Sequence, residues 1–230
     1  MFKARNRFLV SFVIVMAYAG ATMPTGAAVE SFSVDYGSSA STLAEGDSEN
    51  LALSDFDPSL GILTGVTITL VSNDSIKSKV INVNMTSSSS QNYSGATATL
   101  PVTVTTLDGL TTTANGVAGP FSGSVSGPLG TIATAGTISE IVNTSASVVP
   151  GDFVLYEGAA QTFDVNVLVS DGIYSGSSAG NSVAFFGSGS SYGTVGVTYD
   201  YSPIPEPGTL VAGLGALGYC GLRITRRFRA

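Results

Sequence analysis

Short segments in which every second residue is apolar constrain this chain most. The positions between them hold Thr, Ser, Asn and Asp, so each segment has one apolar and one polar face. This two-residue repeat is typical of a half-buried strand and does not fit an amphipathic helix. The apolar positions are Val66, Ile68 and Leu70; Ile81, Val83 and Met85; Leu100, Val102 and Val104; Phe163, Val165, Val167 and Val169; and Val195, Val197, Tyr199 and Tyr201.

Residues 29–202 therefore predict one all-β domain, an antiparallel β-sandwich or a jelly-roll-like fold. Ser and Thr supply 51 of the 172 residues in 31–202, a share that also fits a disordered stalk. The regular apolar faces argue against a stalk for most of the span. Two stretches, 87–95 and 175–182, keep a loop-like composition.

A tight corner is predicted at FDPSLG, residues 56–61, before the longest alternating segment. Asp57 can cap a turn, Pro58 fixes φ at its second position, and Gly61 can leave it with positive φ. We expect Phe56 and Leu60 to enter the core, and the following strand to be central.

Charge is segregated along the chain. Residues 29–202 hold two cations, Lys77 and Lys79, against 15 Asp and Glu, which gives a net charge of −13. The other Lys and Arg lie near the two ends. An acidic middle segment repels phosphates, which excludes nucleic acid as a partner.

The first 28 residues have the three parts of a secretory signal peptide. A basic start precedes an apolar run over 8–21, and small residues with a helix-breaking Pro follow over 22–28. Small side chains at Gly26 and Ala28 predict cleavage after Ala28. A retained membrane anchor is the alternative, but the run is short against the ~20 residues of a span. The basic residues are Lys3, Arg5 and Arg7.

Residues 203–230 form a second targeting segment. A Pro-rich hinge leads into an apolar stretch over 208–222, which is about 22 Å long as a helix. A hydrocarbon core is ~30 Å thick, so this transmembrane helix is short. The basic tail after it should stay cytoplasmic, which places residues 29–202 outside the inner membrane. The tail cations are Arg223, Arg226, Arg227 and Arg229.

This segment resembles the PEP-CTERM sorting signal of Gram-negative bacteria. The likeness rests on Pro205, Glu206 and Pro207, the short Gly-rich helix after them, and the terminal Arg run. It implies recognition by an exosortase, a membrane cysteine transpeptidase that cuts near the motif and passes the protein onward. Proteins with this signal commonly occur in bacteria that make extracellular polysaccharide. An uncut tail anchor is the alternative.

The domain itself resembles the choice-of-anchor E family of bacterial surface proteins. The matching residues are FDPSLG-x-L-T-x-V at 56–66, and GTVGVTYDY at 193–201 after FFGSG at 185–189. The resemblance implies a shared β fold and a surface location. It implies no activity and no functional residues.

The composition argues against catalysis. The chain has no His, which excludes a His base and His-ligated zinc. A Ser–Lys pair would need Lys77 or Lys79, which fit solvated lysines that protect an edge strand. Carboxylate pairs for glycoside hydrolysis stay open, but the chain lacks Trp for a sugar platform. We therefore predict no enzymatic activity and no cofactor.

An acidic run offers a candidate calcium site, since carboxylates in loops suit hard cations. It lacks the spacing of a known calcium loop, and a solvated acidic loop is the favoured explanation. No metal ligands are therefore assigned. The run comprises Glu45, Asp47, Glu49, Asp55 and Asp57.

The sequence thus predicts an exported protein of the cell surface or the extracellular, biofilm-associated matrix. Signal peptidase and exosortase would process it, with the inner membrane as a transient station. The alternative is a carbohydrate-binding or adhesive module, with or without calcium, that uses tyrosines as ligand platforms. The candidate platforms are Tyr93, Tyr156, Tyr174 and Tyr192, for which ordinary packing is the competing explanation.

Overall fold

The structure is a computed structural model that describes residues 26–85 and 89–204. In this part of the chain the regular elements are strands and two short 3-10 helices, η1 and η2. In chain order they are β1 (Ala28–Tyr36), β2 (Leu43–Ala44), β3 (Ser48–Ser54), β4 (Gly61–Asn82), β5 (Gln91–Thr105), β6 (Thr111–Val125), β7 (Ile132–Ser147), η1 (Pro150–Tyr156), β8 (Thr162–Val169), β9 (Ile173–Ser178), η2 (Ala179–Asn181) and β10 (Val183–Pro203).

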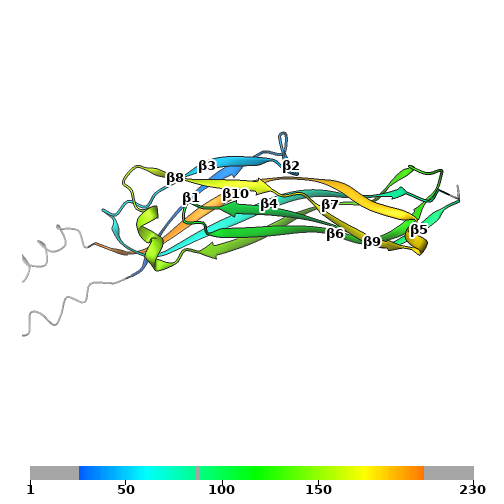
Figure 1. The fold of residues 1–230 in the computed structure, drawn as a ribbon. Helices are drawn as coiled ribbons and strands as arrows, with labels where there is room; N and C mark the ends of the chain where they lie inside the picture. Colours follow the sequence, from blue (N-terminus) through cyan, green and yellow to red (C-terminus); the bar gives the residue numbers. More distant parts are fainter. Residues whose placement is uncertain (1–25, 86–88, 205–230) are drawn as a thin grey trace, which may run out of the picture.

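The strands form two antiparallel sheets that pack as a sandwich (Figure 1), which confirms the predicted class. The first sheet has the order β1-β10-β4-β7, and β2 pairs with β10 beyond the end of β1. The second sheet has the order β3-β8-β5-β6, and β9 pairs with β5 beyond the end of β8.

The pair β4–β10 runs the length of the sandwich. Its ladder extends from Gly61 opposite Pro203 to Asn82 opposite Val183. A strand of this length spans about 70 Å, which gives the molecule its elongated shape (Figure 1). At one end Ala28 pairs with Tyr201, so β1 begins where β10 finishes. We call this the terminal end and the opposite one the distal end.

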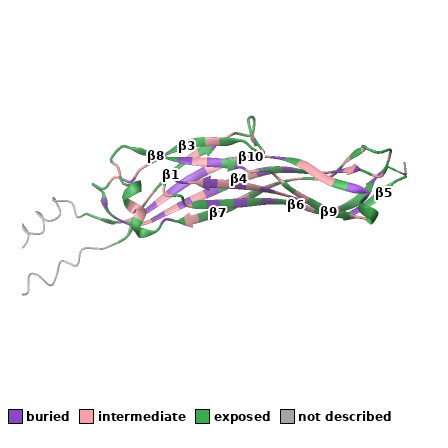
Figure 2. Cartoon of the chain, viewed as in Figure 1, coloured by how far each residue is buried: buried purple, intermediate pink, exposed green. Residues whose placement is uncertain are grey.

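Four of the five predicted alternating segments have the expected inward face. The side chains at 66, 68 and 70, at 100, 102 and 104, and at 163 to 169 in steps of two are buried. So are Val195, Val197 and Tyr199, whereas Tyr201 is half-buried. Figure 2 shows this buried material along the length of the strands.

The prediction for the fifth segment, which placed Ile81, Val83 and Met85 on the inward face, is wrong. Met85 is 85% exposed and Val83 is also exposed, whereas Asn82 is fully buried. From Val66 to Asn82, β4 keeps its even-numbered side chains inward, and this register continues past the apolar residues. Burial of Asn82 is tolerated because its Nδ2 donates to the Gly127 carbonyl at 2.7 Å and its Oδ1 accepts from the Asn84 amide at 2.9 Å.

The FDPSLG corner is partly as predicted. The Ser59 amide donates to Asp57 Oδ1 at 2.8 Å, and Phe56 is fully buried. Leu60 is 40% exposed instead of buried. Gly61 lacks the expected positive φ, and a Cβ there would collide with the Ser202 carbonyl. The glycine therefore permits close approach between β4 and β10. As predicted, β4 is central.

Both segments expected to be loops contribute to strands. Residues 91–95 begin β5, and 175–178 finish β9. Their hydroxyls bond across the pair, with Oγ of Ser94 3.0 Å from Oγ of Ser177, and Oγ1 of Thr97 2.7 Å from Oγ of Ser175. Cross-strand hydroxyl pairs explain how such polar sequences join a sheet.

Toward the distal end, the sheets approach closely because aromatic rings lie over glycines. Tyr174 of the second sheet covers Gly187 of the first, and Phe185 of the first covers Gly176 of the second. A smaller apolar cluster fills this end, separate from the main core. The smaller cluster comprises Val80, Tyr93, Ala96, Val125 and Val183.

Replacing Gly187 should therefore destabilise the fold. A Cβ there would meet both the Tyr174 ring and the Lys77 carbonyl, and this carbonyl belongs to β4, the strand paired with β10. We expect Gly187→Ala to lower the free energy of unfolding by about 2 kcal/mol in urea titrations. Gly151→Ala is the control, because its Cβ would meet nothing within 4 Å. Equal stability of both variants would contradict the packing.

Candidate functional site

The predicted sorting residues lie outside the described residues. These are Pro205, Glu206, Pro207 and the tail arginines at 223, 226, 227 and 229. Most of the signal peptide also lies outside, but Ala28, the predicted cleavage residue, opens β1. No helix in 26–85 or 89–204 is long and apolar enough to cross a membrane, and the expected helix over 208–222 falls beyond them.

The sandwich interior holds a polar cluster that sequence reasoning missed. Tyr36 Oη donates to Ser72 Oγ at 2.9 Å and lies 2.9 Å from Ser191 Oγ. Ser72 Oγ also donates to Asp74 Oδ1, while Asp74 Oδ2 lacks a hydrogen-bond partner. Burial, opposed by the serine hydrogen bonds and assisted by the Glu140 charge, raises the pKa of the Asp74 carboxyl. The only signal for this cluster is a run of polar residues at inward positions of β4.

The two serines of this cluster lie on the opposite face of the sheet from the lysines. Ser72 and Ser191 face inward, whereas Lys77 and Lys79 lie on the outer face of the same sheet, Lys77 exposed and Lys79 half-buried. A Ser–Lys pair is therefore not assembled among these residues. The lysines are solvent-facing as predicted, but β4 is central, so the idea that they protect an edge strand is wrong.

Asp74 on β4 and Glu140 on β7 are register partners, and they are the two carboxylates that the strand pairing brings together at the cluster. Asp74 is 2% exposed. Glu140 Oε1 accepts the backbone amide of Val117 on β6, in the other sheet. Glu140 thereby satisfies an edge amide and links the sheets.

Three members of the acidic run, Glu45, Asp47 and Glu49, are held by separate local partners. Tyr174 Oη donates to Glu45 Oε1. The Ala44 amide donates to Asp47 Oδ2 at 3.0 Å, and the Gly37 amide donates to Glu49 Oε2 at 3.0 Å. Within the described ranges, no three His, Cys, Asp or Glu side chains are grouped to hold a metal ion. The candidate calcium ligands are thus not brought together.

Asp55, another residue of the acidic run, lines a groove at the terminal end. Glu30, Asp57 and Gln161 also border this groove, which has a volume of about 310 Å³. Asp55 Oδ1 and Glu30 Oε2 are buried atoms without hydrogen-bond partners. Burial raises the pKa of Asp55, so the groove disfavours its own negative charge.

Only two of the four candidate tyrosine platforms are accessible. Tyr93 and Tyr156 are 8% and 1% exposed and belong to the interior. Tyr174 is half-buried against Gly187, with its hydroxyl on Glu45. Tyr192 is half-buried and borders a groove on the outer face of the first sheet.

This Tyr192 groove has a volume of about 270 Å³. One row across β7, β4 and β10 places Ile141, Asn73 and Tyr192 side by side. Hydroxyl and amide groups beside an aromatic ring suit a sugar, which offers hydroxyls and apolar C–H faces. The residues lining it are Thr42, Asn73, Asp74, Ser75, Ser139, Glu140, Ile141, Ser190 and Tyr192.

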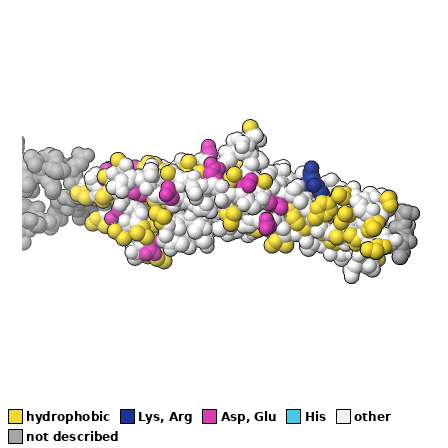
Figure 3. Space-filling view, turned by 45° about the horizontal axis from the view of Figure 1, so that its top comes forward, with side chains coloured by type: hydrophobic (Ala, Val, Ile, Leu, Met, Phe, Trp, Pro, Cys, Tyr) yellow, Lys and Arg dark blue, Asp and Glu magenta, His cyan; other side chains and the backbone are white. Residues whose placement is uncertain are grey.

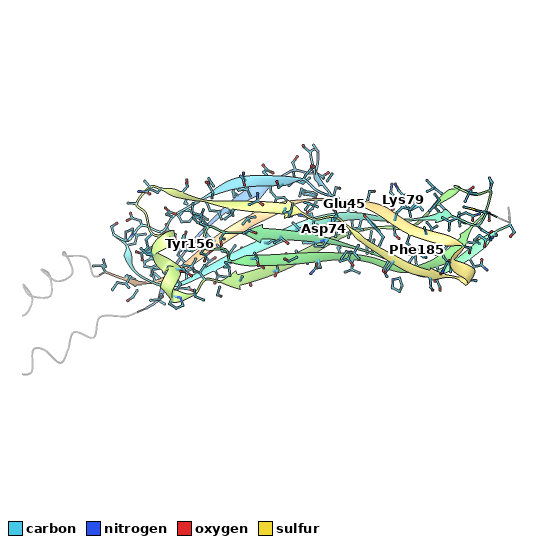
Figure 4. The ribbon with its side chains drawn as sticks, viewed as in Figure 1. Glu45, Asp74, Lys79, Tyr156 and Phe185 are labelled. Carbon is cyan, nitrogen blue, oxygen red and sulfur yellow. The ribbon has the colours of Figure 1, made fainter. Side chains whose placement is uncertain are left out.

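Charge is distributed unevenly along the molecule. Tyr156 lies at the terminal end, Asp74 and Glu45 lie midway, and Lys79 and Phe185 lie toward the distal end (Figure 4). Figure 3 shows lysine toward the distal end and carboxylates over the remaining length of the visible face. The sequence has no Asp or Glu in 76–107, 118–139 or 172–199.

Comparisons with known proteins assign no family. No family model matches the chain, and no curated protein matches it. Similar solved structures include the infectious bursal disease virus Gx strain and the VP2 subviral particle of that virus, each 13% identical. They cover 87% of this chain but 49% and 50% of the viral chains, with TM-scores of 0.21 and 0.16. The chain thus spans about half of the viral chains' length, and a likeness this weak carries no argument.

The raised pKa of Asp74 makes a pH-dependent prediction. Its folded pKa lies above the unfolded value, so the folded state favours the neutral acid and loses stability as pH rises above about 4. We expect Asp74→Asn to raise Tm at pH 7 by about 2–4 °C. The gain should shrink as the pH falls toward 4.

Asp164→Asn is the matched control, because Asp164 is exposed on β8 and its loss changes the net charge equally. Thermal melts at both pH values measure the effect. A lower Tm for Asp74→Asn at neutral pH would show that the charged form is stabilising and would contradict this account.

Proposed function

We propose that the chain is an exported, exosortase-processed protein of the bacterial cell surface or extracellular matrix, with a non-enzymatic β-sandwich as its passenger. The proposal derives from the signal peptide and from Pro205, Glu206 and Pro207 ahead of the apolar helix and Arg tail. In it, residues 208–222 form a short transmembrane sorting helix, and the basic tail stays cytoplasmic.

One structural observation supports this reading most. The Ile204 amide donates to the Leu60 carbonyl at 3.1 Å, and β1 begins opposite Tyr201. The folded domain therefore uses its sequence up to the residue before the sorting motif. Cleavage after residue 205 would leave the ladder between β10 and β4 intact, and the cut would fall at the terminal end.

The sheet order supports the jelly-roll form of the fold. With β2 and β9 set aside as edge extensions, the eight main strands counted in chain order give 1-8-3-6 in one sheet and 2-7-4-5 in the other. Interleaved Greek keys produce such an order. The jelly-roll fold by itself does not indicate which function the protein has.

A carbohydrate-binding module is the second candidate. The Tyr192 groove favours it, because an aromatic ring there stands beside Asn73 and several hydroxyls. Calcium does not enter this candidate, since Glu45, Asp47 and Glu49 of the acidic run are each engaged by a separate local partner.

Intact mass of the mature protein from native cells tests the sorting proposal. We expect a species that lacks residues 1–28 and the segment after about residue 205, seen only when the exosortase gene is present. Replacing Pro205, Glu206 and Pro207 by Ala should abolish the trimming. A mass that retains residues 223–230 in both strains would instead indicate an uncut tail anchor.

A further inference from the structure

We propose that the outer face of the first sheet binds an acidic polysaccharide along a strip that starts at the Tyr192 groove and runs toward the distal end. This inference rests on the proposed export, because it requires the sandwich to meet extracellular polymer. It goes further by naming the ligand's charge class and the surface that binds it.

The strip follows from strand register. Beyond the Tyr192 row, the next rows across β7, β4 and β10 are Ser139–Ser75–Ser190, Thr137–Lys77–Ser188 and Thr134–Lys79–Phe186. We call these four rows the lysine strip. From Asn73 to Lys79 it covers about 20 Å along β4, room for several linked sugars.

Charge complementarity selects an anionic ligand. Lys77 and Lys79 are the only cations of the described residues, and both project from this strip. Its outward positions include no carboxylate. The inward-facing Asp74 and Glu140 also line the groove at its start, and the other 13 Asp and Glu of the described ranges lie elsewhere. A polyanion is therefore repelled by most of the molecule and attracted only here.

Both lysines are available for binding. Neither forms an ion pair with an acidic side chain in the described part of the chain; Lys77 is exposed and Lys79 is half-buried. Lys79 Nζ lies 5.8 Å from the centroid of the Phe186 ring on the neighbouring strand. This contact places the ammonium group over the ring of the half-buried Phe186.

The remaining side chains favour a sugar over another anion. Ser, Thr and Asn supply hydroxyl and amide groups, and Tyr192 and Phe186 supply aromatic surface at the two ends of the strip. A polyuronate offers carboxylates for the lysines, hydroxyls for the polar rows and C–H faces for the rings. An acidic peptide would use the lysines alone.

Binding of the full-length chain, purified in detergent, to three immobilised polymers tests this. We expect binding to alginate that weakens as salt is raised, and much weaker binding to neutral dextran and to polyglutamate. Lys77→Ser with Lys79→Ser should weaken alginate binding about tenfold, and arginine at both positions should retain it. Tyr192→Ser should weaken it without changing the salt dependence.

Added carboxylates provide the matched control. Thr137→Asp with Ser188→Asp places two acids on the lysine strip, whereas Thr111→Asp with Asn115→Asp places two at exposed positions of β6 in the other sheet. Only the first pair should abolish alginate binding. Equal loss in both pairs, or equal binding to polyglutamate, would overturn the proposal.

The two proposals fail separately. Alginate binding by the purified chain does not involve exosortase. Normal trimming without binding would therefore overturn only the strip, and binding without trimming would overturn only the sorting.

Discussion

The ladder between β4 and β10 is the interaction on which the remaining structure depends. These strands pair from Gly61 and Pro203 at the terminal end to Asn82 and Val183 at the distal end. β1 and β7 then add to their outer edges, and the second sheet packs on their inward side chains. Because β10 is the last strand, the first sheet cannot close until nearly all of the domain has been synthesised. Folding is therefore dominated by contacts between residues far apart in sequence, which is typical of slow-folding β-sandwiches.

The side chains on the β4–β10 ladder change in chemical character from the terminal end to the distal end. Near the terminal end its inward face is apolar, with Ile68 and Val197 fully buried in the main core. Midway along the ladder, the buried Ser72, Asp74 and Ser191 form a polar cluster in place of hydrophobic contacts. One oxygen of this cluster, Asp74 Oδ2, has no hydrogen-bond partner. Farther on, glycines under aromatic rings bring the sheets close, and the outer face bears both lysines. With sorting at the terminal end, the proposed binding strip would lead away from the site of processing.

Sequence alternation was sufficient to predict the sandwich, because most inward positions are apolar and the solvent positions are hydroxyl-rich. It failed at Ile81, Val83 and Met85, since the face of β4 is fixed by its register with β10 and not by local hydrophobicity. The candidate site was predictable only in part. Tyr192 was predicted as a candidate platform, but the residues beside it, Asn73 and Ile141, come from strands more than 50 residues away in sequence. Such pairings, and the glycine–ring contacts, have no local signature in a single sequence.

Hydrogen exchange of the backbone amides tests the central role of this ladder most directly. If β4 and β10 form one continuous support, their amides should exchange most slowly in the domain, including those of Ser72 to Ser78 beside the polar cluster. Amides at the exposed edges of β6 and β7 should exchange faster. Fast exchange at Ser72 to Ser78, with slow exchange on both sides, would show that the ladder is interrupted there. In that case the two ends would be separate stable units, contrary to this account.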